Sequence, residues 1–411
     1  MAAATLATQT PAMAAGSAGT SGSATVAARL QHQLNAALKY AGSGVGVLVE
    51  NVSSGQVLFS RNSGIPRPPA SVEKLYTTVA AVNLLGANAR FQTAVLGKGA
   101  LEPGGVWHGN LYLRGSGDPT FGDGAWNRTY EDGRGPTALQ LTVQLRHAGI
   151  RRVTGHIFAD ESLFDTDRGG PATHNKPDTP DYGGELSALV YDHGMSTAKM
   201  SPAVFAAHEL AVTMRAAGIQ VGAAARTMHT PAGSVKLAHV ESPPLSVLVR
   251  LMDVPSDDLI ADMLAKQLGA RQFHEGTLAA GAIEIRQAIR QDYDLSPVLF
   301  DGSGLDHADR STPTEVVSLL QKMWLTPTGN LLHAALPVVG EQGTVADMGV
   351  HTPAQGNCVA KTGTLNNVTN LAGYCSARGG QTLAFAVMID GPPNYLAIPM
   401  LSSAVAAIAR Y

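Results

Sequence analysis

The chain contains few cysteines, few aromatic residues and no segment of concentrated positive charge. Two cysteines in 411 residues exclude a disulfide-rich scaffold, and no Cys-x-x-Cys or His-rich spacing indicates a zinc site, so no metal is expected. The 29 basic and 32 acidic residues nearly cancel without a dense Lys/Arg run, and we expect no nucleic-acid partner. No segment reaches the roughly 18 apolar residues of a membrane helix, so no transmembrane segment is expected. What remains is a chain that is 45% hydrophobic and long enough for two or three domains.

The first part of the chain is poor in residues that could build a core. Residues 1–24 carry no charged side chain and consist largely of Ala, Gly, Ser and Thr. The segment 11–15 resembles the small-residue cleavage end of a secretory signal, although the basic start and long apolar stretch of a complete signal are missing. We expect residues 1–24 to be either a disordered tail or the remnant of an export signal.

The hydrophobic pattern beyond residue 24 predicts an α+β protein with a large, mostly β insertion. A strand at 44–51, its hairpin partner at 55–59 and a helix at 71–86 are followed by short strand-like runs, among them LAVTMRAAG at 210–218. Longer elements return later, namely helices at 244–268, 278–291, 313–324 and 399–410 and a strand at 382–389. We expect residues 25–90 and 238–411 to form one discontinuous catalytic domain. Residues 91–237, the inserted region, would form one or two nested domains.

The two cysteines lie symmetrically about a predicted turn. Residues 356–364 and 368–375 are typical of two strands joined at 365–367, and the midpoint between Cys358 and Cys375 falls in that turn. Cross-strand neighbours have Cβ atoms about 4.5 to 5.5 Å apart, which is close to disulfide reach. The pattern is compatible with a disulfide, which would suit an exported protein, and equally with two buried free thiols.

Three short motifs of the form S-x-x-K, S-D-x and K-T-G occur in this order along the chain. They are Ser71-Val72-Glu73-Lys74, Ser256-Asp257-Asp258 and Lys361-Thr362-Gly363. Each is weak alone, because residues 196–199 also read S-x-x-K. Context separates the two matches: Ser71 begins an apolar helix that would place Lys74 beside it, whereas Pro202 soon interrupts the second match.

The first motif supplies a nucleophile and a base. The free N–H groups at a helix start favour an attacking alkoxide and a developing oxyanion, and a neutral Lys74 would accept the proton of Ser71. The other interpretation is a capping Ser71 with a solvated lysine one turn later.

The other two motifs supply a proton relay and a carboxylate site. Ser256 precedes a predicted helix and is a candidate relay to the leaving amine, although it could simply cap that helix. Lys361 lies on a predicted strand, where Gly363 lets a ligand approach closely. Lys361 could bind a terminal carboxylate, and its charge would favour the neutral form of Lys74. A solvated lysine at a strand edge is the alternative.

Two other hydrolase classes are excluded by their own motifs. His208-Glu209 and His274-Glu275 begin like the metalloprotease sequence H-E-x-x-H, but Val212 and Leu278 replace the second His. Around Ser303, Asp301 and Leu305 replace the glycines of G-x-S-x-G, so this stretch is interpreted as a tight loop near the active site.

Together the motifs and their surroundings resemble the low-molecular-mass class C penicillin-binding proteins, which are D-alanyl-D-alanine carboxypeptidases and endopeptidases. The stretches that carry the resemblance are PPASVEKLYTT at 68–78, GNLYLRGSGDPTFG at 109–122, GELSALVYDHG at 184–194, SPPLSVLVRLMDVPSDD at 242–258, FDGSGLDHADRSTP at 300–313 and AKTGTLNNVTNLAGY at 360–374. The interval between Ser71 and Ser256 is too long for a compact β-lactamase and suits this family's inserted domains.

The resemblance implies a fold and a set of roles. The fold would be a penicillin-binding, serine β-lactamase-like transpeptidase domain carrying the insertion. Ser71 would be the acylated nucleophile, Lys74 the general base and Ser256 the relay. Substrate carboxylate would bind at the group formed by Lys361, Thr362, Gly363 and Thr364. The backbone N–H groups of Ser71 and Thr364 would form the oxyanion hole. The family needs no cofactor, acts on peptidoglycan peptides ending in D-Ala-D-Ala, binds β-lactam antibiotics, and works outside the cytoplasm in soluble or peripheral form.

One position departs from the family pattern, which has Asn where this chain has Asp258. An ionised Asp can only accept hydrogen bonds, and a carboxylate beside Lys74 would stabilise the ammonium form of the proposed base. We therefore expect slower acylation or a rate profile shifted to alkaline pH. A non-catalytic protein that binds peptidoglycan or penicillin is the alternative, and a β-lactamase is a second one.

Overall fold

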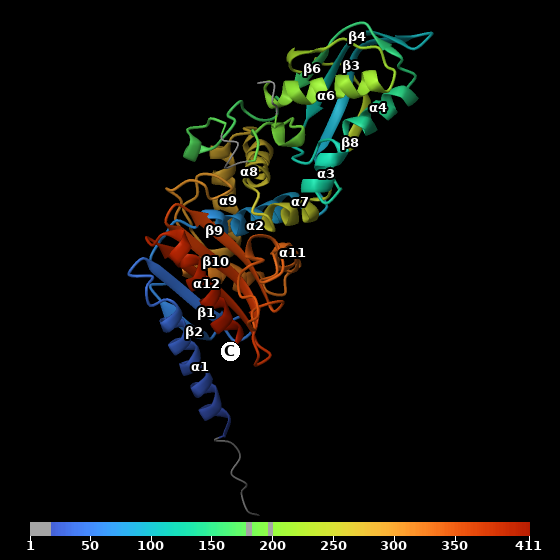
Figure 1. The fold of residues 1–411 in the computed structure, drawn as a ribbon. Helices are drawn as coiled ribbons and strands as arrows, with labels where there is room; N and C mark the ends of the chain where they lie inside the picture. Colours follow the sequence, from blue (N-terminus) through green and yellow to red (C-terminus); the bar gives the residue numbers. More distant parts are fainter. Residues whose placement is uncertain (1–17, 178–182, 196–199) are drawn as a thin grey trace, which may run out of the picture.

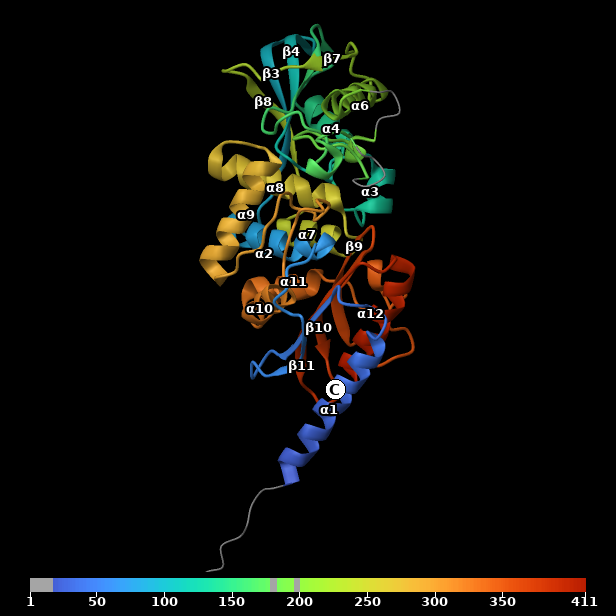
Figure 2. The same ribbon diagram turned by 90° about the vertical axis from the view of Figure 1, so that its left-hand side faces the viewer.

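The computed structural model describes residues 18–177, 183–195 and 200–411. Two β-sheets lie at opposite ends of an elongated molecule, with several helices between them (Figures 1 and 2). Helix α1 (Ala18–Ala37) begins inside the segment expected to be disordered, and residues 1–17 lie outside the described residues. None of the helices in the described residues has both the length and the apolar character to cross a membrane.

The first sheet combines strands from both ends of the chain, as the sequence predicted. Its order is β2-β1-β11-β10-β9, and neighbouring strands are antiparallel throughout. Leu48 contributes to the core on one face, whereas Val47 and Val49 contribute to the core on the other. This is the two-residue alternation of a sheet covered on both sides. The strands are β1 (Val45–Asn51), β2 (Val57–Arg61), β9 (Cys358–Leu365), β10 (Val368–Ser376) and β11 (Thr382–Asp390).

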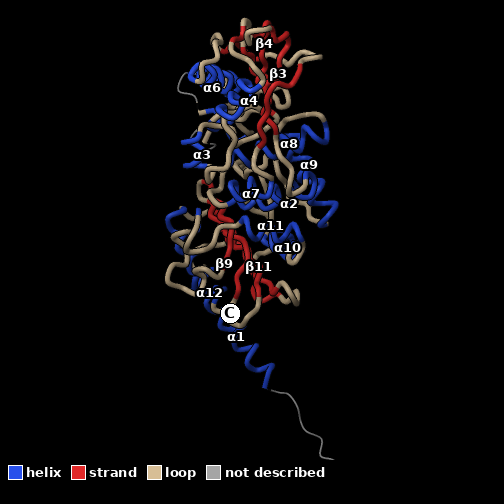
Figure 3. Tube along the Cα trace, turned by 90° about the vertical axis from the view of Figure 1, so that its right-hand side faces the viewer, coloured by secondary structure: helices blue, strands red, loops and turns tan. Residues whose placement is uncertain are grey.

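Helices cover the two faces of this sheet. Helix α12 (Asn394–Ala409) packs with α1 over one face, where Leu34, Phe385 and Leu401 share a core. The other face and the centre of the molecule hold the remaining helices of the proposed catalytic domain (Figure 3). They are α2 (Lys74–Leu85), α7 (Leu245–Asp253), α8 (Asp258–Phe273), α9 (Leu278–Tyr293), α10 (Pro313–Met323) and α11 (Pro327–Ala335).

The inserted region forms a second sheet with the order β7-β6-β4-β3-β8, and β5 also pairs with β4. Strand β8 runs to Glu241 and pairs with β3, so this sheet extends past the boundary drawn at residue 237. The strands are β3 (Gln92–Glu102), β4 (Val106–Gly115), β5 (Arg152–Val153), β6 (Ile157–Asp160), β7 (Ala224–Thr227) and β8 (Val235–Glu241). The described residues of the inserted region also form the helices α3 (Gly124–Tyr130), α4 (Ala138–His147) and α6 (Pro202–Ala216).

The strand-like interpretation of residues 210–218 was wrong, because most of them belong to α6. Ser201 caps this helix by accepting a hydrogen bond from the Val204 N–H, and Pro202 occupies its first turn. Buried small residues then recur at helical spacing. The signal was therefore present, but the short apolar run LAV at 210–212 is equally compatible with a strand.

The cysteines occupy paired positions of the β9–β10 hairpin. Cys358 and Cys375 are register partners with a Cα–Cα distance of 4.1 Å, and a disulfide joins them. Both side chains are buried beneath α12 and α1 in the core of that face. The bond therefore links the two strands at the end away from their turn.

Candidate active site

Ser71 lies in a short 3-10 turn, η1 (Ala70–Glu73), which passes directly into α2 at Lys74. Ala70, directly before the serine, has a left-handed backbone (φ 46°), and Gly86 caps the far end of α2. Lys74 Nζ donates a hydrogen bond to Ser71 Oγ at 3.0 Å. The sequence motif thus places an amine beside a hydroxyl, as one-turn spacing requires. The competing S-x-x-K match at 196–199 lies outside the described residues.

Lys74 is completely buried and has three acceptors for its three N–H groups. Besides Ser71, it donates to the carbonyl oxygen of Ser303 at 2.7 Å and forms a short ion pair with Asp258. This arrangement satisfies the ammonium form of the amine. Asp258 therefore lies where it would oppose proton transfer from Ser71 to Lys74.

The second motif sits between two helices. The segment predicted as a helix at 244–268 folds into two helices, α7 and α8, with Ser256 between them in a left-handed conformation (φ 67°). Asp257 caps α8, accepting from the Ile260 N–H at 2.8 Å. Ser256 itself does not cap the helix, and its hydroxyl faces the third motif.

The third motif runs along β9, the terminal strand of its sheet. Lys361 is fully buried, and its Nζ donates to Ser256 Oγ at 2.7 Å and to the Thr362 carbonyl at 3.0 Å. Burial, followed by the charge of Lys74, lowers the pKa of Lys361 to about 7. A solvated edge lysine is therefore not what the structure contains.

Gly363 is placed where a larger residue would collide with the nucleophile turn. A Cβ atom at this position would lie 2.5 Å from the Pro69 carbonyl oxygen and 3.0 Å from the Val72 nitrogen. The absence of a side chain thus lets β9 approach η1 closely. Thr364 follows on the exposed side of the strand.

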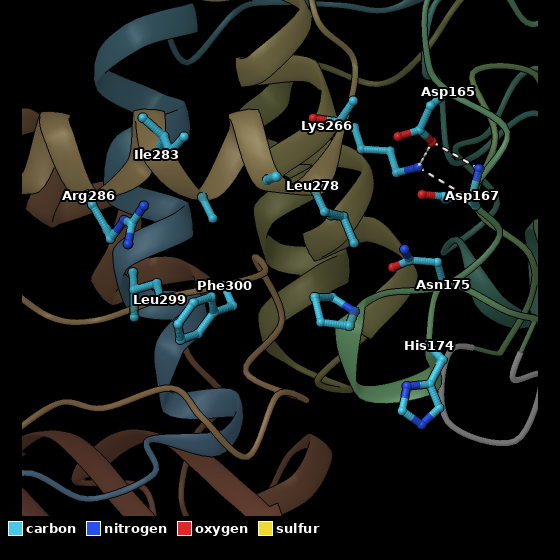
Figure 4. A pocket seen from close by; sticks show the side chains of 15 residues that line it. Asp165, Asp167, His174, Asn175, Lys266, Leu278, Ile283, Arg286, Leu299 and Phe300 are labelled. Carbon is cyan, nitrogen blue, oxygen red and sulfur yellow. Dashed lines mark hydrogen bonds and ion pairs between the residues drawn. The ribbon is translucent and has the colours of Figure 1, made fainter.

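All three motifs line one cleft of about 690 Å³. Ser71, Ser256, Asp258, Thr362 and Thr364 contribute, so the structure brings together residues from distant parts of the chain. The rest of the lining is Thr344, Asp347, Met348, Ile398, Pro399 and Ser402. A larger cavity of about 770 Å³ between α8, α9 and the loop near residue 170 is lined by none of these motif residues (Figure 4). There Lys266 is anchored by Asp165 and Asp167.

Sequence reasoning missed several residues that shape the cleft. Asn370 of β10 donates to the carbonyls of Pro68 and Pro69, at 2.9 and 2.8 Å, and so holds the chain before Ser71. Thr344 Oγ1 accepts a hydrogen bond from Thr362 Oγ1 at 2.7 Å. Asn370 lies within a stretch quoted for the resemblance, but nothing local to either residue indicates these partners. The tight loop expected at Ser303 does reach the site, through its carbonyl.

Buried acids lie behind the nucleophile turn. Glu73, Asp301 and Asp309 approach one another closely enough to share an ion. Asp301, however, already accepts backbone N–H bonds from Ser303, Gly304 and Asp306, and these bonds shape the loop that reaches Lys74. Burial, then the neighbouring Asp309 and Asp301, raise the pKa of Glu73 well above its usual value. The raised pKa favours the neutral form of Glu73 beside these acids.

Comparison with solved structures confirms the α+β fold and its additional β-sheet. The chain is similar to penicillin-binding protein 4 (DacB) of Haemophilus influenzae, with a TM-score of 0.77 at 20% identity, over 92% of this chain and 99% of the other. A second structure of that protein carries a bound β-lactam and matches with a TM-score of 0.71 at 21% identity, over the same shares of each chain.

Comparison of sequences agrees with the structural likeness. The D-Ala-D-Ala carboxypeptidase 3 (S13) family matches residues 26–203 and 183–410, and the chain belongs to this family. It is 26% identical to D-alanyl-D-alanine carboxypeptidase DacB of Haemophilus influenzae over 85% of this chain and 86% of that protein. It is also 26% identical to the D-alanyl-D-alanine carboxypeptidase of Actinomadura sp. R39, over 89% of this chain and 81% of that protein.

Proposed function

We propose that the protein is a serine D-alanyl-D-alanine carboxypeptidase or endopeptidase that acts on peptidoglycan peptides through an acyl-enzyme on Ser71. β-Lactam antibiotics would acylate the same serine. The observation that carries this proposal is the hydrogen bond between Lys74 Nζ and Ser71 Oγ, 3.0 Å long, inside a cleft lined by all three motifs. Family membership supports the peptide substrate, and the β-lactam complex of the H. influenzae protein supports the inhibitor.

Acylation proceeds by nucleophilic attack of Ser71 Oγ on the carbonyl carbon of the D-Ala-D-Ala bond. Neutral Lys74 accepts the hydroxyl proton, and the backbone N–H groups of Ser71 and Thr364 stabilise the oxyanion. The C–N bond then breaks, and a proton passes to the leaving amine through Ser256, which is hydrogen-bonded to Lys361. Water hydrolyses the resulting ester, releasing the shortened peptide and restoring the Ser71 hydroxyl.

Lys361 has a second task in this scheme. Its ammonium and the hydroxyl groups of Thr362 and Thr364 would bind the substrate's terminal carboxylate. Because burial and Lys74 lower the pKa of Lys361 to about 7, the arrival of a carboxylate would favour its charged form. A peptidoglycan substrate would require the protein to work outside the cytoplasm, in the periplasm or cell wall.

A second candidate is a protein that binds peptidoglycan or penicillin without turnover. The ion pair between Lys74 and Asp258 favours it, since a satisfied ammonium is a poor base. In both proposed functions the three motifs form a ligand site. The two functions differ in whether Ser71 reacts with the ligand.

Intact-protein mass spectrometry after incubation with benzylpenicillin separates the candidates. We expect a one-to-one adduct with the wild type and with Ser402→Ala, a control serine from the same cleft, but none with Ser71→Ala. Release of D-alanine from diacetyl-L-Lys-D-Ala-D-Ala would follow the same pattern. Absence of both adduct and D-alanine in the wild type across pH 6 to about 10, a range that brackets the ionisation of a lysine, would overturn the catalytic proposal.

A further inference from the structure

A buried histidine of the inserted region lies next to the second motif. His193 belongs to the short turn η3 (Asp192–Gly194) and has a left-handed backbone (φ 55°). Its side chain is only 6% exposed, and its Nε2 lies 2.9 Å from Glu131 Oε1. On the other side, its Nδ1 lies 4.0 Å from Asp257 Oδ2. One imidazole ring therefore stands between two carboxylates, one from each part of the molecule.

The surroundings hold this ring in place. The Trp126 ring packs edge-on against it at a centroid distance of 5.4 Å. The His193 carbonyl accepts from the Glu185 N–H at 3.0 Å, and a Cβ at Gly184 would lie 2.0 Å from that carbonyl oxygen. Such tight backbone packing leaves the ring little freedom to move away from Asp257.

The charges around His193 favour its imidazolium form. Burial opposes protonation, but Asp257, Glu131 and Asp192 together outweigh it and raise the pKa of His193. Burial raises the pKa of Asp257, whereas the charges of His193 and Lys74 act to lower it. A series of interacting charged groups thus runs from Glu131 through His193 and Asp257 to the Asp258–Lys74 pair.

We propose that Glu131 and His193 are positioning residues through which the inserted region holds the Ser256–Asp258 segment and sets the pH range in which Lys74 can act as a base. The proposal rests on the function proposed above. A positive His193 offsets the charge of Asp257, which would otherwise add to that of Asp258 in stabilising the Lys74 ammonium. In a chain that has Asp instead of Asn at position 258, this compensation keeps proton transfer accessible nearer to neutral pH.

The first experiment measures the pH dependence of the acylation rate of the full chain with nitrocefin, by stopped-flow absorbance. His193→Gln removes the compensating cation, so we expect slower acylation at neutral pH and a profile shifted upward by about 0.5 to 1 unit. Glu131→Gln removes the anion that supports protonation of His193, and should shift the profile in the same direction by a smaller amount. His147→Gln, an exposed histidine of the inserted region, is the matched control and should leave the profile unchanged.

The direction of the shift distinguishes this role from simple support of the fold. A purely structural defect would lower the rate by one factor at every pH. If the rates of His193→Gln and Glu131→Gln are lowered by the same factor at every pH, and thermal unfolding confirms that both variants are folded, the proposal is overturned. An unshifted profile at wild-type rate would overturn it equally.

A second measurement follows His193 directly, and does not depend on catalysis. Titration of the imidazole signals by NMR should give His193 a pKa above the usual value of a histidine, and Glu131→Gln should lower it. An unchanged titration in Glu131→Gln would contradict the proposed charge series. If the wild type forms no Ser71 adduct at any pH, the proposed function fails, whereas adduct formation with wild-type profiles in both variants refutes only this inference.

Discussion

Asp258 and Lys74 form the ion pair on which we expect the rate of the proposed acylation to depend. The structure places this carboxylate directly on the amine that also contacts Ser71. An Asn at the same position could accept a hydrogen bond from Lys74 and donate one to a substrate, without stabilising the ammonium by a full charge. The departure from the family pattern is therefore a difference in charge at the base.

Asp258→Asn should accelerate acylation at neutral pH and move the rate profile to lower pH by about 1 unit, because loss of the charge destabilises the Lys74 ammonium. The measurement is the acylation rate with benzylpenicillin between pH 5 and about 10, a window chosen to span lysine ionisation. Asp347→Asn, another carboxylate of the cleft, is the control and should have a much smaller effect. Identical rates and profiles for Asp258→Asn and wild type would contradict this account.

Glu73 is a residue of the first motif whose role concerns stability. Neither of its buried carboxyl oxygens has a hydrogen-bond partner among the described residues, and its raised pKa keeps it neutral in the fold. In the unfolded chain it ionises near its usual pKa of about 4.3. Its contribution to stability is therefore complete below that value and is lost as pH rises toward the folded pKa.

Glu73→Gln should be more stable than the wild type at pH 8, because a neutral amide does not ionise on unfolding. The difference in the free energy of unfolding between variant and wild type should be smaller at pH 5. It should fall by about 1.4 kcal/mol for each pH unit in which Glu73 is ionised in the unfolded chain but neutral in the folded one. Thermal unfolding followed by circular dichroism at the two pH values measures it. A wild type that is more stable than the variant at pH 8 would show that Glu73 is not neutral in the fold.

At the scale of elements, β9 and η1 must fit together closely. Strand β9 is the last strand of its sheet, so part of its outer edge is available to an extended peptide. Its other neighbour in space is the turn that carries Ser71, which Asn370 of β10 also holds. The sheet thus positions Ser71, the proposed nucleophile, relative to the proposed carboxylate site.

Gly363→Ala should slow acylation by about 100-fold, because the added methyl group would push η1 away from β9 and displace Ser71 by a fraction of an ångström or more. Gly64→Ala is the matched control, since no atom lies within 4 Å of a Cβ at that position. Second-order rates with nitrocefin, together with melting temperatures, distinguish misplacement from unfolding. A Gly363→Ala variant that keeps the wild-type rate would show that the contact relaxes without cost.

At the scale of the whole molecule, the inserted region is not an independent appendage. Phe164, Leu186 and Val190 of that region belong to the same hydrophobic core as Tyr76 of α2 and Leu259 of α8. A shared core couples the stability of the two parts, because neither can be removed without exposing apolar surface of the other. The catalytic domain and the inserted region are defined by their position in the sequence. That they fold as separate domains stays a prediction.

Leu186→Ala should therefore destabilise the catalytic part as well, by about 2 to 5 kcal/mol for a fully buried leucine. The readout is the temperature at which the protein stops labelling with a fluorescent penicillin, which reports on the cleft alone. Leu139→Ala, at a largely exposed leucine of the inserted region, should change this temperature little. If Leu186→Ala unfolds the inserted sheet but still loses penicillin labelling only at the wild-type temperature, the two parts unfold separately.

The sequence by itself determined the chemistry available to this protein and most of its local structure. Helix starts such as Pro313 and the strands of the first sheet follow from capping residues and from hydrophobic periodicity, which act over a few residues. Sequence reasoning failed in α6, where a short apolar run is compatible with both a helix and a strand. The order of the three motifs was enough to predict one site from their resemblance to a family.

Only the tertiary structure decided which of these groups touch. The Ser303 carbonyl on Lys74, Thr344 on Thr362, and His193 beside Asp257 join residues far apart in the chain. Their contacts depend on strand order, on the path of the loops and on burial, and none of these has a local signature. Burial shifts the pKa of Glu73 and Lys361, and nearby carboxylates raise that of His193 against the effect of burial, so each charge depends on the complete fold around the group.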